Sequence, residues 1–376
     1  MINNQEFLLA TQNIRAAVIG ELNAPWKIED VELESPRPDE ILVKMTGTGI
    51  CHTDIACRHG FPVPMPIVLG HEGAGIVESV GADIKHIKAG DHVVLSFDSC
   101  GSCKNCQRDE PAYCYEFFPR NFSGGRASDE SSPISLNGKQ LHSVFFSQSS
   151  FATYAIARET NAVVIEKDLP LEIMGPLGCG IQTGAGAAVL SLGVGEGDSF
   201  AIFGGGAVGL SALLAAKAVD AGTVIVVEPK VERHELAYEF GADLIINPIE
   251  TPDVLAAIKN YCGGVDYAFD TTGIPAVIEV AMETLLPGGM LGMVGAPPPE
   301  ASMPANLMSM LGRGVGAKYI IEGDSDPKSF IPQMIEWYQA GKFPFDKMIE
   351  TFPFDQINEA AEAAESGRVI KPVLVF

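Results

Sequence analysis

Four cysteines stand close together in the pattern Cys-x2-Cys-x2-Cys-x7-Cys, at Cys100, Cys103, Cys106 and Cys114. Four thiolates on one short segment can close a tetrahedral shell around Zn²⁺ and leave no position for water or substrate. Iron–sulfur clusters and disulfides are the alternatives. In the ferredoxin pattern the fourth cysteine follows after three residues and precedes proline, whereas here seven residues intervene and Tyr115 follows. The spacing therefore predicts a zinc that stabilises a loop without taking part in chemistry.

Three further residues form a second ligand set. Cys51 lies in Gly-Ile-Cys-His-Thr-Asp, His71 in Gly-His-Glu-Gly, and Cys179 in Gly-Cys-Gly. Two sulfurs and one imidazole leave a fourth zinc position open, which is typical of a catalytic site. A single cysteine is more often a small buried hydrophobic residue, so this prediction depends on the three residues acting together. Together with the first set, it gives two zinc ions per chain.

A glycine-rich motif follows an apolar run and precedes a stretch rich in alanine and leucine. Its glycines are Gly204, Gly206 and Gly209. In a dinucleotide-binding turn, the first glycine permits the tight turn, the second lets a pyrophosphate approach, and the third lets helix and strand pack closely. The helix that begins at Ala207 and Val208 would offer free N–H groups to the phosphates.

An acidic residue at the expected distance favours NAD over NADP. Glu228 ends the apolar run 223–227 and lies 19 residues beyond Gly209. About 20 residues separate the motif from the carboxylate that binds the adenosine ribose in such folds. This carboxylate would repel a 2′-phosphate. A buried glycine turn that binds nothing is the alternative, and it would not require the flanking strands or the acidic residue.

The formal net charge of −23 disfavours nucleic acid and anionic membrane surfaces as partners. A polyanionic cofactor then needs local positive groups, for which His52, Arg233 and Lys371 are candidates. The uncharged or nearly uncharged stretches 173–195 and 199–216 are interrupted by glycines, so we expect neither to span a membrane.

Cysteine usage favours a reducing compartment. Six of the eight cysteines are assigned to metal, and Cys57 and Cys262 remain as packing residues. The N-terminal Met-Ile-Asn-Asn-Gln-Glu lacks the charged and apolar regions of a signal peptide. We therefore expect a cytoplasmic protein.

The predicted elements divide the chain into two domains. Residues 1–180 contain short β-rich runs with many glycines and prolines, including the zinc lobe at about 96–116. In 181–320 strands alternate with helices, which predicts a doubly wound parallel sheet. The segment 321–376 is expected to return to the first domain and to end in a strand at 371–376.

With these motifs, the chain resembles the zinc-dependent medium-chain alcohol dehydrogenases along essentially its whole length. Cys₂His ligand sets are known from that family. Within it, the chain is most similar to the aryl-alcohol branch, the benzyl alcohol dehydrogenases and their geraniol-oxidising relatives. The segments that carry this likeness are 99–106, 111–114, 121–124 and 145–154.

The resemblance implies an α/β protein with a GroES-like β-rich catalytic domain and a doubly wound Rossmann coenzyme domain. It also implies a homo-oligomer, a tetramer or a dimer. The implied activity is reversible NAD-dependent oxidation of a primary aromatic or allylic alcohol to the aldehyde. The alternatives are other primary alcohols such as geraniol, a glutathione-dependent formaldehyde dehydrogenase, and a non-enzymatic or quinone-reductase-like relative. Of these, only the non-enzymatic and quinone-reductase-like relatives usually lack zinc ligands.

The resemblance also assigns roles to residues around the catalytic zinc. Zinc would lower the pKa of the alcohol, and Thr53 would accept its proton and pass it towards the nicotinamide ribose. Asp54 resembles the carboxylate that orients the zinc-binding histidine, and Glu72 the carboxylate near the metal. The remaining assigned positions are a cofactor and relay role for His52, nicotinamide-side contacts at Thr183 and Val294, and a substrate-pocket wall or ordinary core aromatic at Phe97.

The chain departs from the family at one position of the proton relay. Many relatives carry a histidine five residues after the first zinc ligand, where this chain has Ala56. The relay must therefore end elsewhere, at His52 or directly in water.

Overall fold

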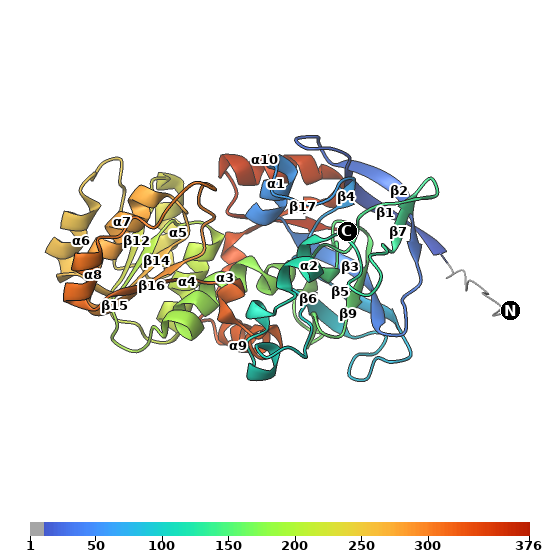
Figure 1. Cartoon of the computed structure of the whole chain (residues 1–376), viewed down its shortest axis with the longest axis horizontal. Helices are drawn as coiled ribbons and strands as arrows, with labels where there is room; N and C mark the ends of the chain where they lie inside the picture. The colour runs from blue at the N-terminus through green and yellow to red at the C-terminus, as the bar shows by residue number, and fades with distance from the viewer. Residues whose placement is uncertain (1–10) are drawn as a thin grey trace. The chain divides into compact units, whose positions relative to one another are not determined.

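The computed structural model describes residues 11–376, which form two compact units (Figure 1). The first contains the described residues up to Arg108, Cys114–Cys179 and Ile349–Phe376. The second contains Asp109–Tyr113 and Gly180–Met348. The N-terminal residues on which the absence of a signal peptide was judged lie outside the described residues.

The first unit is built on two β-sheets. One has the order β4-β1-β2-β7-β8, with bounds Ile67–Val68, Thr11–Ile19, Lys27–Glu34, Ile134–Leu136 and Lys139–Gln140. The other has the order β10-β6-β5-β3-β18-β17, with bounds Ala162–Ile165, His92–Leu95, Gly73–Val80, Glu40–Gly49, Lys371–Val375 and Ile349–Pro353. β9, Tyr154–Arg158, also pairs with β3. Apolar side chains of these strands, among them Val43, Val93 and Leu95, form a buried core.

Three helices belong to this unit, namely α1 (His52–His59), α2 (Phe117–Phe122) and α10 (Ile357–Ser366). α1 begins immediately after Cys51, whose backbone N–H donates to the Asp54 carboxylate over 2.9 Å. This local bond fixes the backbone of a predicted zinc ligand at the start of a helix.

The second unit contains a six-stranded sheet in which every neighbouring pair is parallel. The order is β13-β12-β11-β14-β15-β16, with bounds Leu244–Ile246, Val224–Val227, Phe200–Phe203, Val265–Asp270, Leu285–Met293 and Gly316–Tyr319. The side chains of β11 and β12 are all buried, as expected of central strands covered on both faces. The predicted doubly wound parallel sheet is thereby confirmed.

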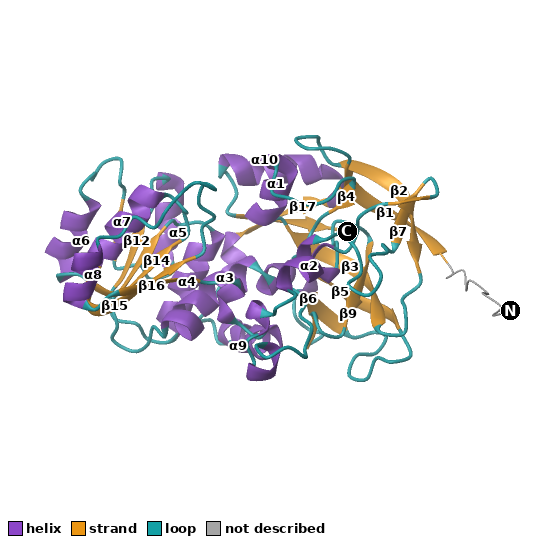
Figure 2. Ribbon diagram, in the orientation of Figure 1, coloured by secondary structure: helices purple, strands orange, loops and turns teal. Residues whose placement is uncertain are grey.

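The second unit also contains α-helices, drawn in purple in Figure 2. They are α3 (Gly180–Gly186), α4 (Ala207–Ala218), α5 (His234–Glu239), α6 (Val254–Cys262), α7 (Pro275–Thr284), α8 (Leu307–Arg313) and α9 (Pro327–Gln339). α6 shows why the sequence starts and stops a helix locally. The Asp253 carboxylate accepts from the Ala256 N–H at its start, and Gly263 adopts φ +85° at its end.

The second unit extends further along the chain than the sequence indicated. The chain returns to the first unit at Ile349, whereas the sequence placed this return at 321. β16 completes the parallel sheet, and α9 then packs on α3 within the same unit. No helix among residues 11–376 is long and apolar enough to cross a membrane.

Candidate active site

The four clustered cysteines come together as a potential metal site. The sulfurs of Cys100, Cys103, Cys106 and Cys114 all lie within 4.8 Å of one another. Backbone N–H groups point at these sulfurs: Cys100 donates to Cys114 over 3.2 Å, and Cys103 donates to Cys100 over 3.2 Å. Burial opposes ionisation, but the N–H groups of Ser102 and Cys103 lower the pKa of the Cys100 thiol to about 6. Four sulfurs gathered in this way fit a zinc ion.

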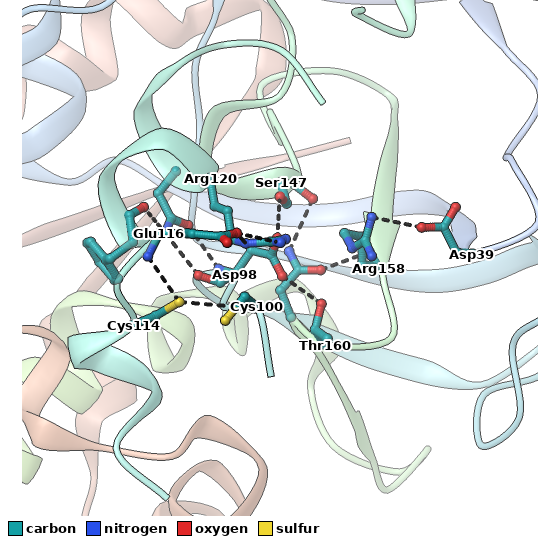
Figure 3. A network of polar contacts seen from close by, with 12 residues as sticks. Asp39, Asp98, Cys100, Cys114, Glu116, Arg120, Ser147, Arg158 and Thr160 are labelled. Atoms are coloured by element: carbon teal, nitrogen blue, oxygen red, sulfur yellow. Dashed lines mark hydrogen bonds and ion pairs between the residues drawn. The ribbon is translucent and has the colours of Figure 1, made fainter. Parts of the chain in front are cut away.

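A buried polar network holds this loop on its unit (Figure 3). Asp98 is 1% exposed and accepts hydrogen bonds from Thr160 at 2.6 Å, Arg120 at 3.1 Å and Ser147 at 3.2 Å. Arg120 also pairs with Glu116, whose backbone N–H donates to the sulfur of Cys114. The charge on Asp98 is therefore compensated from several sides, and the loop is tied to the segment after β6.

The second ligand set also assembles, with one addition. Donor atoms of Cys51, His71, Glu72 and Cys179 all lie within 4.8 Å of one another, and all four residues belong to the first unit. Cys51 directly precedes α1, the pair His71 and Glu72 directly precedes β5, and Cys179 directly precedes α3. Three turns far apart in sequence thus converge on one point.

The imidazole of His71 is oriented for metal binding. Its Nδ1 lies 3.0 Å from Oδ1 of Asp54, and both side chains are fully buried. Its Nε2 is buried and has no hydrogen-bond partner among the described residues. A buried nitrogen without a hydrogen-bond partner is unfavourable. A cation bound at Nε2 would supply the missing partner, so it fits the site. The role of Asp54 in orienting a metal-binding histidine stays a prediction.

Electrostatics favour a thiolate at Cys51. Its pKa lies well below the ordinary value, chiefly because Cys179 hydrogen-bonds to it. Burial opposes this shift, and the positive charge of Lys371 supports it. Metal binding requires the deprotonated sulfur, so the donor set fits Zn²⁺.

Glu72 and Lys371 form a buried ion pair beside these ligands. The Nζ of Lys371 lies 2.8 and 2.9 Å from the two oxygens of Glu72, and Lys371 is 3% exposed. Burial raises the pKa of Glu72, although Lys371 partly counteracts this. Sequence analysis gave Lys371 a cofactor contact and did not foresee this pairing. The cofactor contact stays a prediction.

Thr53 provides a hydroxyl on α1 close to the sulfur of Cys51. Its Oγ1 lies 3.8 Å from the sulfur of Cys51, and the residue is half-buried. His52, the first residue of α1, is exposed. Ala56, one turn further on, carries no titratable group. The structure therefore brings Thr53 to the metal ligands and leaves His52 at the surface.

Aromatic rings pack against the ligand histidine. The ring of Phe146 lies flat on His71, with centroids 4.6 Å apart and planes at 29°, and Phe145 meets it edge-on at 5.4 Å. Phe122 contacts both phenylalanines. Phe97 is 2% exposed and belongs to the same cluster through Phe117. The sequence did not indicate the contact between Phe146 and His71.

The glycine-rich turn has the shape of a phosphate cradle. Gly204 adopts φ +106°, and a Cβ there would lie 2.2 Å from the hydroxyl of Thr271. A Cβ on Gly209 would lie 1.9 Å from the carbonyl oxygen of Gly204. Gly206, by contrast, faces open space, with only Arg233 Nη1 at 3.9 Å. Ala207 and Val208 then begin α4, whose N–H groups face the turn.

Glu228 lies beside this turn, as the spacing predicts. It follows β12, is 3% exposed, and accepts from the Gly205 N–H at 2.6 Å. Arg233 pairs with the same carboxylate at 3.3 Å. Val294 follows β15 at the carboxyl edge of the sheet and is half-buried, as is Thr183 on α3. Ligands of open α/β sheets bind at this edge.

Comparison with known proteins decides the family. The Alcohol dehydrogenase GroES-like domain matches residues 37–167, and the Zinc-binding dehydrogenase domain matches residues 207–340. The geraniol dehydrogenase of Castellaniella defragrans is 52% identical over 377 residues, covering 100% of both chains. The chain is a zinc-dependent medium-chain alcohol dehydrogenase.

Solved structures agree with this assignment to the family. The benzyl alcohol dehydrogenase of Acinetobacter calcoaceticus superposes with a TM-score of 0.93 at 44% identity, over 97% of this chain and 99% of that one. An alcohol dehydrogenase zinc-binding domain protein from Burkholderia ambifaria gives 0.95 at 47% identity, over 98% and 100%. The expected resemblance and the GroES-like and Rossmann-like fold are confirmed.

Proposed function

We propose that this alcohol dehydrogenase uses NAD to oxidise primary aromatic or allylic alcohols reversibly to their aldehydes. The observation that carries the proposal is the juxtaposition of the Cys51, His71 and Cys179 donor set with the phenylalanine cluster. The 44% identical benzyl alcohol dehydrogenase and the 52% identical geraniol dehydrogenase support an apolar, unsaturated substrate. Geraniol itself is the second candidate.

Two zinc ions per chain fit the two donor groups. Cys100, Cys103, Cys106 and Cys114 would hold one ion for stability. Cys51, His71 and Cys179 would hold the other, which when bound supplies Lewis acidity to the substrate hydroxyl. Thr53 then accepts the alcohol proton, Asp54 keeps the imidazole in place, and the Glu72–Lys371 pair balances charge beside the ligands.

NAD is the proposed cofactor because of the surroundings of the glycine turn. Gly206 and the start of α4 leave room and N–H groups for the pyrophosphate. The buried Glu228 would accept the ribose hydroxyls and repel a 2′-phosphate. Thr183, Val294, His52, Arg233 and Lys371 keep their proposed contacts with the cofactor.

The substrate proposal rests on apolar burial. Phe97, Phe122, Phe145 and Phe146 provide an aromatic cluster next to the donor set. Each additional CH₂ equivalent buried contributes ~0.8 kcal/mol, so a conjugated alcohol should exceed ethanol in kcat/KM by about a hundredfold or more. The test measures kcat/KM for benzyl alcohol, geraniol and ethanol, each with NAD and with NADP. Formaldehyde with glutathione is assayed in the same way. Equal kcat/KM for ethanol and benzyl alcohol would contradict the proposal.

A homo-oligomer is proposed on the basis of an exposed apolar face in the second unit. Leu307, Met308 and Leu311 on α8 are 74–76% exposed. β16 is the edge strand beside β15 and offers unpaired backbone groups. A second copy of this chain, related by a two-fold axis, could pair the two edges and cover both helices. Light scattering of wild type and Leu311→Glu would test this, with a dimer or tetramer expected only for wild type.

A cytoplasmic location is also proposed. All eight cysteines lie within the described residues as free thiols, which suits a reducing compartment. The only partners proposed are the alcohol or aldehyde, the cofactor, the two metal ions and further copies of the chain. The net charge of −23 argues against nucleic acid and anionic membranes.

A further inference from the structure

The segment that carries Phe146 has an unfavourable backbone. Phe146, Ser147 and Ser149 adopt φ values of +50°, +48° and +45°, although none is glycine. Such conformations are uncommon for residues with a side chain and are energetically unfavourable. They persist only where surrounding contacts determine them, and they gather at functional sites.

Three buried polar side chains supply those contacts, and we call them the polar clamp: Gln148, Ser149 and Asn161. Each is at most 1% exposed. The Asn161 amide donates to the carbonyl oxygens of Phe146 and Ser147, both over 3.1 Å. The Ser149 hydroxyl donates to the Val68 carbonyl over 2.7 Å and accepts from the Phe145 N–H over 2.9 Å.

Gln148 connects the strained segment directly to the ligand histidine. Its Nε2 donates to the carbonyl oxygens of His71 and Ser96, both over 3.0 Å. Its Oε1 accepts from the Gly73 N–H over 3.0 Å. The amide therefore brackets the main chain on both sides of Glu72. The neighbouring Ser147 hydroxyl donates a hydrogen bond to the Asp98 carboxylate (Figure 3).

We propose that the polar clamp positions the metal-ligating imidazole, by holding Phe146 in a left-handed conformation that lays its ring on His71. Asp54 fixes the ring from Nδ1. The bond to Asp54 holds one edge of the imidazole, and the stacked Phe146 ring supports one face of it, which restrains the tilt of the ring plane. These residues act on the metal only through His71, and are therefore positioning residues.

The inference rests on the metal site of the proposed function, and it predicts metal retention independently of turnover. Groups that orient a ligand histidine typically contribute 10–100-fold to metal affinity. Loss of the clamp should therefore loosen the metal at Cys51, His71 and Cys179 while the four-cysteine site keeps its own.

The experiment uses enzyme in which Co²⁺ replaces zinc at the Cys51 group. Its visible absorption reports the site, and an added chelator measures the release rate. Ser149→Ala removes a buried hydroxyl of the clamp. Ser143→Ala is the matched control, because its buried hydroxyl contacts Ser132 and the Ile134 N–H but no clamp residue. Phe146→Leu is paired with Phe200→Leu, because the buried ring of Phe200 stacks on Phe269 and contacts none of the rings beside His71.

We expect Ser149→Ala and Phe146→Leu to release Co²⁺ about tenfold faster than wild type, and to change its absorption. Each control should release it at the wild-type rate. Equal release rates within each pair would overturn the inference. Wild type that retains Co²⁺ but oxidises no alcohol would contradict the proposed function alone, and wild type that takes up no Co²⁺ would contradict both.

Discussion

The ammonium of Lys371 is bound to both carboxylate oxygens of Glu72, at 2.8 and 2.9 Å, although 299 positions separate the two residues in the chain. Both side chains are buried beside the cysteine and histidine donors. Removing one partner of a buried pair leaves the other charge without compensation, whereas removing both is much less harmful.

We therefore expect Lys371→Met to lower the unfolding free energy by ~3–5 kcal/mol. The double variant Lys371→Met, Glu72→Gln should recover a large part of this loss. Urea unfolding of both single variants and the double variant gives the coupling energy. Strictly additive losses would show that the pair contributes no coupling.

Cys103→Ser should remove the metal of the four-cysteine site. Because a structural zinc contributes directly to folding, the variant should contain one zinc per chain in place of two and should unfold at lower temperature. Metal analysis together with thermal unfolding measures both effects. Cys262→Ser is the control, since this half-buried thiol donates to the backbone carbonyl groups of Ile258 and Gly264 and belongs to neither donor group. A Cys103→Ser enzyme with two zinc ions would refute the assignment.

Glu228→Ala should relax the choice of cofactor. The carboxylate lies beside the Gly205 N–H, where it would meet the adenosine ribose. Its removal should raise KM for NAD and improve kcat/KM for NADP, each by about tenfold, or ~1.4 kcal/mol. Glu232→Ala, an exposed carboxylate on the following turn, should leave both values unchanged. If wild type already uses NADP as well as NAD, Glu228 has a different role.

Thr53→Ala should lower kcat by at least about a hundredfold, the lower range for loss of a proton-transfer group. Thr53→Ser keeps the hydroxyl near Cys51 and should retain most activity. Steady-state rates across pH distinguish the two variants. Ala56→His should alter the pH dependence of kcat without being needed for turnover. Full activity of Thr53→Ala would place the proton acceptor elsewhere.

Tyr113 should make the second unit sensitive to alkaline pH. Burial raises the pKa of its phenol, and the hydrogen bond to Asp324 raises it further. The unfolded chain ionises near pH ~10, so the folded state loses stability as pH rises above that value. Urea midpoints of wild type should therefore fall between pH 8 and pH 11 by more than those of Tyr113→Phe. Equal losses in the two proteins would contradict the raised pKa.

The sequence by itself determined the parts of the site that are formed by residues close together in the chain. Ligand spacing from Cys100 to Cys114 predicts a four-sulfur cage because a single short loop must supply all four donors. The glycine motif followed by Glu228 predicts the cofactor cradle, because one strand–helix–strand unit carries the whole pattern. The alternation of strands and helices in 181–320 likewise predicted the parallel sheet.

Only the tertiary structure decided the contacts that join distant segments. The pairing of Lys371 with Glu72, the Phe146 ring on His71, and the end of the second unit at Met348 all depend on how separate strands and turns pack. No local spacing encodes such contacts. The left-handed residues of 146–149 are the clearest case, since their own backbone preferences oppose the conformation that the buried clamp imposes.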